Sequence, residues 1–195
     1  YVVQAAGALF TAVLFGFFSR TYRRPFLLHW ARSWSAMCVM LASAALGYAI
    51  NESGPPTSGA RLAISTVASV SGYLQVAWLL LGCAELVSQK SANRFLRYKN
   101  AVLGFAVALG VLAVALFANH PDPLGPRFIV RVAVRSGITG PAFLIAAAVV
   151  WRARPGESVR SLGRALVGGA SVLYGLTQLQ LLWSLAFNQT VASQP

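Results

Sequence analysis

The chain has 195 residues, of which 57% are hydrophobic and 10% charged, and its formal net charge is +12. Its polar segments are all short, so we expect no soluble catalytic domain of ordinary size. The basic residues gather in a few turns and form no face interleaved with exposed aromatic side chains, which argues against nucleic acid as a partner.

Six apolar stretches follow one another along the chain, each close to the roughly 20 residues that a helix needs to cross a bilayer. They cover residues 1–18, 26–50, 62–86, 101–118, 128–150 and 165–187. Each is apolar on nearly every face, whereas the strands of a membrane barrel alternate apolar and polar residues. The sequence therefore predicts an all-α fold, a polytopic bundle of six transmembrane helices that forms a single domain over residues 1–195.

The turns between these stretches alternate between strongly basic and almost uncharged. The basic turns are residues 19–25, 87–100 and 151–164, and the others are residues 51–60 and 119–127. By the positive-inside rule we expect the basic turns in the cytoplasm and both chain ends outside. A seventh span, if the protein has one, would return the chain to the cytoplasm. Many Arg and few Lys, with abundant Ala, Gly and Val, indicate a GC-rich bacterium, and hence its cytoplasmic (inner) membrane.

Residues for cofactor chemistry are not arranged as that chemistry requires. Retinal needs a lysine inside a span, but Lys90 and Lys99 both lie in a turn. Haem held between spans needs two histidines at one depth, whereas His29 and His120 fall on opposite sides. No cluster has metal-ligand spacing, and no nucleophile shares its depth with a base. We expect no cofactor, no metal and no enzyme activity in these residues.

Three arginines, Arg127, Arg131 and Arg135, are spaced by four and therefore follow one stripe of the fifth predicted helix. One interpretation is a site for an anionic ligand or lipid, with guanidinium groups that match carboxylate or phosphate. The alternative is that the first two reach the headgroups and Arg135 pairs with an outer acid, Glu52 or Asp122.

Polar residues also define one face of the third stretch. They recur at helical spacing, as Ser71, Gln75, Trp78, Gly82 and Glu85. The sixth stretch carries a second polar group, Thr177, Gln178 and Gln180. These groups can hydrogen-bond across helices at about 1 kcal/mol each. The second interpretation is a ligand pocket or polar pathway between the third and sixth helices.

The segment Ser19–Trp34, SRTYRRPFLLHWARSW, resembles the link between the first two spans in the multi-pass N-terminal membrane sensor regions of bacterial histidine kinases and diguanylate cyclases. The resemblance rests on a basic turn followed by an aromatic start of the next span, with Arg23, Arg24, Trp30 and Trp34. It implies an input module that detects a small molecule, a lipid or the state of the membrane. Such a module passes helix motion to a cytoplasmic signalling domain. The resemblance supplies no site residues.

Two other functions fit the same residues. Small residues four apart, such as Ala106 and Gly110, let helices approach closely and suit a non-catalytic accessory subunit of a larger membrane complex. The polar faces and the arginine stripe suit a transporter of a small anionic solute. The expected partners are membrane lipids, including anionic lipids, with a small-molecule ligand, a homodimer or a larger complex as further candidates.

Overall fold

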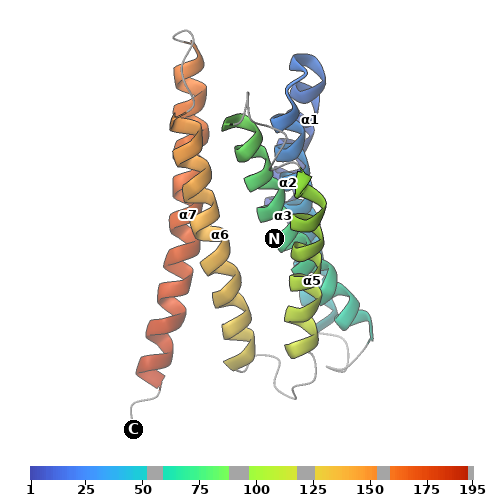
Figure 1. Cartoon of the computed structure of the whole chain (residues 1–195). Coiled ribbons are helices and arrows are strands. Elements are labelled where there is room, and N and C mark those ends of the chain that lie inside the picture. The colour runs from blue at the N-terminus through green and yellow to red at the C-terminus, as the bar shows by residue number, and fades with distance from the viewer. Residues whose placement is uncertain (52–58, 88–96, 118–125, 153–158, 193–195) are drawn as a thin grey trace. The chain divides into compact units, whose positions relative to one another are not determined.

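The computed structural model describes the chain except for residues 52–58, 88–96, 118–125, 153–158 and 193–195. The helices are α1 (Val2–Tyr22), α2 (Pro25–Asn51), α3 (Gly59–Val87), α5 (Lys99–Phe117), α6 (Pro126–Arg152) and α7 (Val159–Ala192) (Figure 1). The described residues contain no strand, and the predicted all-α class is confirmed.

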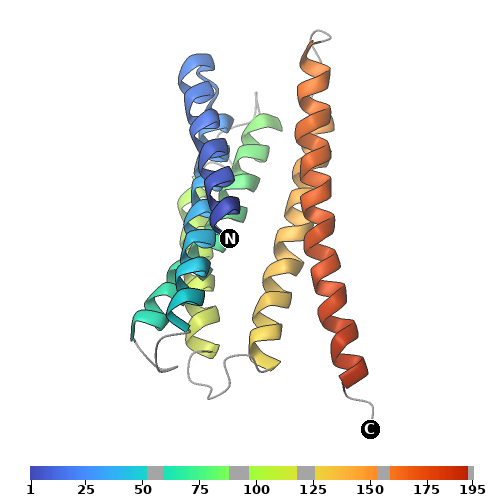
Figure 2. The ribbon, with the colours of Figure 1, turned by 180° about the vertical axis from the view of Figure 1, so that it is seen from behind.

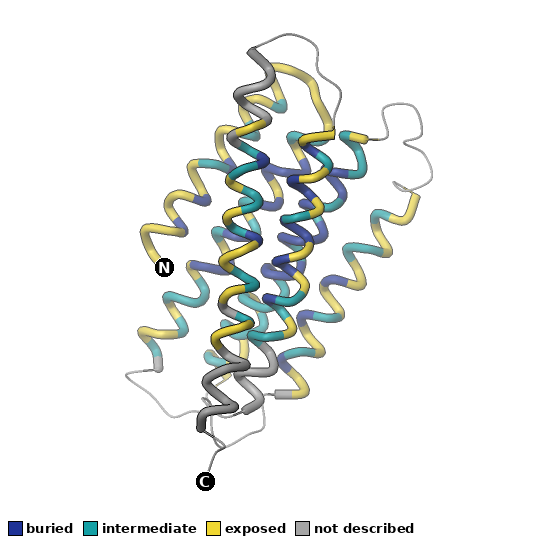
Figure 3. Tube along the Cα trace, turned by 90° about the vertical axis from the view of Figure 1, so that its left-hand side faces the viewer, coloured by how far each residue is buried: buried dark blue, intermediate teal, exposed yellow. Residues whose placement is uncertain are grey.

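In the described part of the chain, five helices, α1, α2, α3, α5 and α6, are long and apolar enough to cross a membrane. Large apolar side chains are exposed along them, including Phe10 on α1 and Phe105 on α5, which are 65% and 69% exposed. In Figure 3 exposed positions recur along the length of these helices. Lipid suits such surfaces, because a helix satisfies its own backbone hydrogen bonds and offers only side chains to the hydrocarbon. By length and composition this is a multi-pass membrane protein, whereas the sixth span and the orientation stay predictions.

The helices extend beyond the apolar stretches from which they were predicted. α1 continues past residue 18 to Tyr22, and α7 begins at Val159 rather than near residue 165. An apolar stretch ends at its first charged residues, but helical backbone bonds continue as long as those side chains can reach water or headgroups. Arg20 in the last turn of α1 is also favourable there, since a cation stabilises the negative end of a helix.

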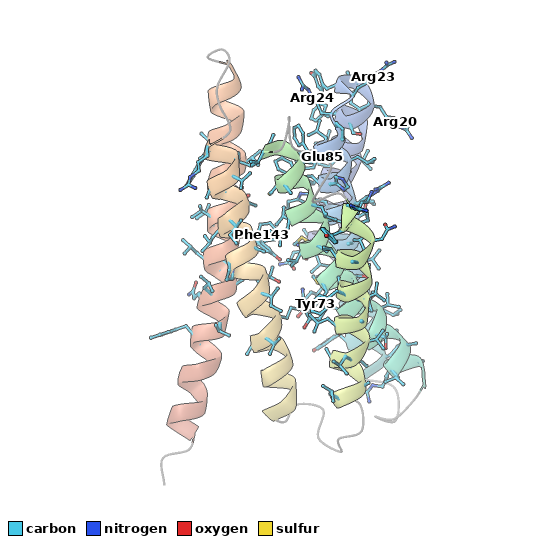
Figure 4. The ribbon with its side chains drawn as sticks, in the orientation of Figure 1. Arg20, Arg23, Arg24, Tyr73, Glu85 and Phe143 are labelled. Atoms are coloured by element: carbon cyan, nitrogen blue, oxygen red, sulfur yellow. The ribbon has the colours of Figure 1, made fainter. Side chains whose placement is uncertain are left out.

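The turn between α1 and α2 is very short, and the chain reverses in it. Arg23 ends α1 with φ 48° and ψ 38°, the left-handed conformation that commonly terminates a helix. Pro25 then begins α2, where its fixed φ suits the first helical position and its missing N–H is not needed. As a result α1 and α2 pack as neighbours, and Arg20 and Arg24 lie at the end of the helices where α2 starts (Figure 4).

The chain divides into two compact units, Tyr1–Pro123 and Leu124–Pro195. In the first unit α2 packs against both α1 and α3, and α5 packs against α3. The second unit is the pair α6 and α7, which run side by side in both Figures 1 and 2. The expected single domain over residues 1–195 stays a prediction.

α3 is the central helix of the first unit. In the 18-residue apolar segment of α3, 56% is buried, whereas the corresponding segments of α1 and α5 are each 17% buried. Gly110 of α5 allows the closest approach, because a Cβ there would lie 2.6 Å from the Cα of Val70 on α3. Tyr73, Ala77 and Ala106 form the buried cluster between these two helices. This packing leaves the polar face of α3 to meet α2, where the candidate site lies.

Candidate functional site

A histidine and a glutamate meet between α2 and α3. Nε2 of His29 lies 3.0 Å from Oε2 of Glu85, and the two side chains are only 6% and 16% exposed. His29 stands one turn into α2 and Glu85 stands in the last turn of α3. Because α2 and α3 are consecutive, neighbouring helices, these positions share the end that also holds the α1–α2 turn (Figure 4).

The pair is close, but its polar groups are not fully satisfied. Oε2 of Glu85 and Nδ1 of His29 are both buried, and neither has an aligned hydrogen-bond partner among the described residues. The 3.0 Å approach is therefore an electrostatic contact rather than a well-directed hydrogen bond. Buried polar atoms in native proteins are usually paired, so these two leave hydrogen-bonding capacity for a further group at this site.

Trp78 connects the pair to two cations. Its ring stacks on His29 with centroids 5.3 Å apart and an interplanar angle of 25°. The guanidinium carbon of Arg32 lies 4.8 Å from the indole centroid, and Nζ of Lys99 lies 5.5 Å from it. Both distances fall within the range in which an aromatic face attracts a cation. Residues of α2, α3 and α5 thus converge on one indole.

We call the residues His29, Arg32, Trp78, Glu85 and Lys99 the α2–α3–α5 cluster. Helical spacing places its members together, since His29 and Arg32 are three apart on α2, and Trp78 and Glu85 are two turns apart on α3. Lys99 is the first residue of α5. The cluster combines a titratable pair with two cations, so its net charge changes when His29 or Glu85 gains or loses a proton.

An aromatic layer fixes the helices next to the cluster. Trp30 is 7% exposed and contacts Phe15 of α1 and Phe26 of α2, with ring centroids 5.7 and 5.3 Å apart. The Trp30 ring also lies close to Gly82 of α3, where a Cβ would be 2.5 Å from it. Only glycine permits this approach without displacement of the indole, so Trp30 holds α1, α2 and α3 in register beside His29.

The structure places part of the predicted polar face of α3 in the interior. Ser71 is 8% exposed and Gln75 is 2% exposed. The backbone carbonyl of Gln75 accepts a hydrogen bond of 2.8 Å from the hydroxyl of Ser33 on α2. Glu85, at the end of the same face, meets His29 of α2. The polar face of α3 therefore contacts α2 at Gln75 and again at Glu85.

The polar residues of α7 interact within the second unit. The hydroxyl of Ser136 on α6 donates a long hydrogen bond of 3.4 Å to Oε1 of Gln178. Thr177 donates to the carbonyl of Tyr174 on its own helix at 2.8 Å, and Gln180 is exposed. The predicted pocket between the third and sixth stretches would join the two units, and it stays a prediction.

The arginine stripe lies on α6, as its spacing predicts. The side chains of Arg127 and Arg131 lie outside the described residues. Arg135 is partly buried and has an interaction partner. An anion or lipid site at this stripe stays a prediction.

Neither motif nor spacing in the sequence marks His29, Arg32 or Lys99 as site residues. In the sequence, His29 enters only as half of an excluded haem pair, Lys99 only as a basic turn residue that excludes retinal, and Arg32 gives no signal of its own. A usable signal was depth, because His29 and Glu85 each lie about one turn from the same end of neighbouring helices. Among the described residues no group of three His, Cys, Asp or Glu could hold a metal ion.

Comparisons with protein family models, with curated proteins and with solved structures found no match to this chain.

Proposed function

We propose that this chain is a sensory input module of the membrane, which detects a small molecule, a lipid or the membrane state and relays it to a cytoplasmic signalling output. One observation carries the proposal, the α2–α3–α5 cluster with its buried pair of His29 and Glu85. Packing alone does not require such a pair, since apolar replacements of buried ion pairs are often neutral or stabilising. Buried ionisable groups are costly unless they are fully paired and hydrogen-bonded, and such groups concentrate at functional sites.

Helix motion is the means of relay that the cluster supports. The attraction between His29 and Glu85 depends on their protonation and on the nearby cations Arg32 and Lys99, so a change in local charge alters how strongly α2 and α3 hold together. Trp78 transmits that change to α5, because it contacts residues of α2 and α5 at once. A stimulus shifts the bundle only by as much as it prefers one arrangement over the other.

The proposal is tested by a distance between α2 and α5 in lipid nanodiscs. Nitroxide labels are placed at Leu28→Cys and Ala101→Cys, both exposed positions, in a chain whose Cys38 and Cys83 are replaced by Ala. Pulsed electron resonance should show two distance populations, and their ratio should change with the anionic lipid fraction or with bilayer thickness. A module with one fixed arrangement would give a single population under all conditions.

Control variants separate the cluster from the bundle as a whole. His29→Ala combined with Glu85→Ala should abolish the change in ratio, whereas Ser35→Ala, at an exposed position of α2 near the cluster, should preserve it. Stable co-purification with a defined partner and a fixed distance would favour the accessory subunit instead. Solute flux in liposomes would favour the transporter.

A further inference from the structure

The α2–α3–α5 cluster carries more positive than negative charge. Arg32 and Lys99 contribute two positive charges and Glu85 contributes one negative charge, so one positive charge is in excess even when His29 is neutral. The only other acid before residue 118 is Glu52, which follows the opposite end of α2. Among the described residues of the first unit, Glu85 is the only acid, so one positive charge of the cluster has no described acid to neutralise it.

The two cations can be reached from outside the bundle. Arg32 is exposed, and Lys99 and Trp78 are partly buried, so the charged groups sit at the rim of the cluster and not in its core. Lys99 also begins α5, whose first turn contains no acidic residue. The N–H groups at a helix start have no intrahelical acceptor, and the helix dipole there favours an anion. These contributions all favour negative charge at one place.

A buried atom at the same place lacks a partner. His29 is 5% exposed, and its Nδ1 has no hydrogen-bond partner among the described residues. Because His29 stacks on Trp78, this atom belongs to the same cluster as the two cations. The excess positive charge at the exposed rim indicates a further anionic group there, and the unpartnered Nδ1 lies in the buried part of the same cluster.

We propose that Arg32, Lys99 and Trp78 bind a phosphate group, and that in the membrane this group is the headgroup of an anionic phospholipid. A guanidinium fork matches phosphate oxygens with two parallel hydrogen bonds, and a lysine adds a mobile point charge. Tryptophan is enriched where headgroups meet hydrocarbon, and basic residues attract anionic lipid to the cytoplasmic leaflet. The bound phosphate offsets the excess charge.

This inference goes beyond the proposed function, because a lipid can be bound without being a signal. Binding is measured as retention of lipid, whereas the relay is measured as a distance between helices. The two can fail separately. A bound lipid with one fixed helix arrangement would remove the relay and leave this site in place.

Native mass spectrometry of the whole chain, released from nanodiscs of phosphatidylglycerol and phosphatidylcholine, tests the site. Arg32→Gln with Lys99→Gln should lower retention of phosphatidylglycerol by at least roughly tenfold, since both charged hydrogen-bond donors to the phosphate are lost. The matched control is Arg20→Gln with Arg24→Gln, which removes two exposed charges from the same end of the unit. The control should retain the lipid.

Two further measurements keep the outcome clear. Arg32→Lys with Lys99→Arg preserves both charges, so it should restore most of the retention and show that loss in the Gln variant is not misfolding. Inorganic phosphate is titrated in nanodiscs of phosphatidylcholine alone. Phosphate binding that the Gln variant loses, with unchanged lipid retention, would support the site and assign it to soluble phosphate. Equal retention and equal phosphate binding in the Gln variant and its control would overturn the proposal.

Discussion

Nε2 of His29 and Oε2 of Glu85 lie 3.0 Å apart in a part of the protein where neither side chain is well solvated. Removal of one partner leaves the other buried and unpaired. We therefore expect Glu85→Ala and His29→Ala each to destabilise the first unit by about 1–3 kcal/mol. The double variant should cost less than the sum of the two.

A double-mutant cycle on thermal unfolding in detergent micelles measures this coupling, because it isolates the term that the two residues share. Additive losses in the double variant would show that His29 and Glu85 do not interact. Glu85→Gln serves as the isosteric comparison, since it keeps the shape of the side chain and removes its charge.

Ser33 and Ser35 lie two residues apart on α2 and provide a matched comparison. The hydroxyl of Ser33 is buried and donates to the carbonyl of Gln75 on α3 at 2.8 Å, whereas Ser35 donates to Ala31 on its own helix at 2.9 Å. Ser33→Ala should cost about 1 kcal/mol, the usual net contribution of a hydrogen bond. Ser35→Ala should leave the melting temperature nearly unchanged, because its bond joins no second helix. Equal effects would contradict the assigned bond between α2 and α3.

At the scale of elements, two glycines of α5 differ in their surroundings. A Cβ at Gly110 would lie 2.6 Å from the backbone of Val70 on α3, whereas a Cβ at Gly104 would meet nothing within 4 Å. Gly110→Ala should therefore separate α3 from α5 and cost roughly 1–3 kcal/mol, as overpacking does. Gly104→Ala should cause no loss of stability.

The comparison is made by thermal unfolding of both variants under identical conditions. The gain in helix propensity is the same for both substitutions, about 1 kcal/mol in soluble helices, so the difference between them reports helix packing alone. A Gly110→Ala variant as stable as Gly104→Ala would mean that α5 does not pack on Val70.

The elements were predictable from sequence where a single physical property determines them. A run of about 20 apolar residues has few folded alternatives to a helix in lipid, so all six helices were expected. Their ends were harder to predict, because charge ends an apolar run without ending a helix, as Arg20 in α1 shows. The left-handed backbone of Arg23, which ends α1, cannot be recognised from the pattern of apolar residues.

The candidate site was less predictable, for a physical reason. The polar face of α3 was apparent from spacing, but spacing within one helix does not reveal which neighbour it meets. Ser33 and His29 of α2 contact that face because α2 packs against α3, and the sequence of α3 alone does not indicate this neighbour.

At the scale of the whole molecule, charge asymmetry connects the site to the membrane. The first unit carries Arg20, Arg24, Arg32 and Lys99 toward one end, and Glu85 is the acid at that end. The positive-inside rule then predicts that the α2–α3–α5 cluster faces the cytoplasm, where both anionic lipid and a signalling output would be found. Sensing and lipid binding both depend on this orientation.

The most direct test of the account is therefore the sidedness of the first unit, measured with a membrane-impermeant maleimide on intact and permeabilised cells. Cys38 and Cys83 are replaced by Ala, and single cysteines are introduced as Gly59→Cys, at the start of α3, or as Arg97→Cys, next to the start of α5; both positions are exposed. The account predicts that Gly59→Cys is labelled in intact cells and Arg97→Cys only after permeabilisation. Labelling of Arg97→Cys from outside, with Gly59→Cys protected, would contradict it.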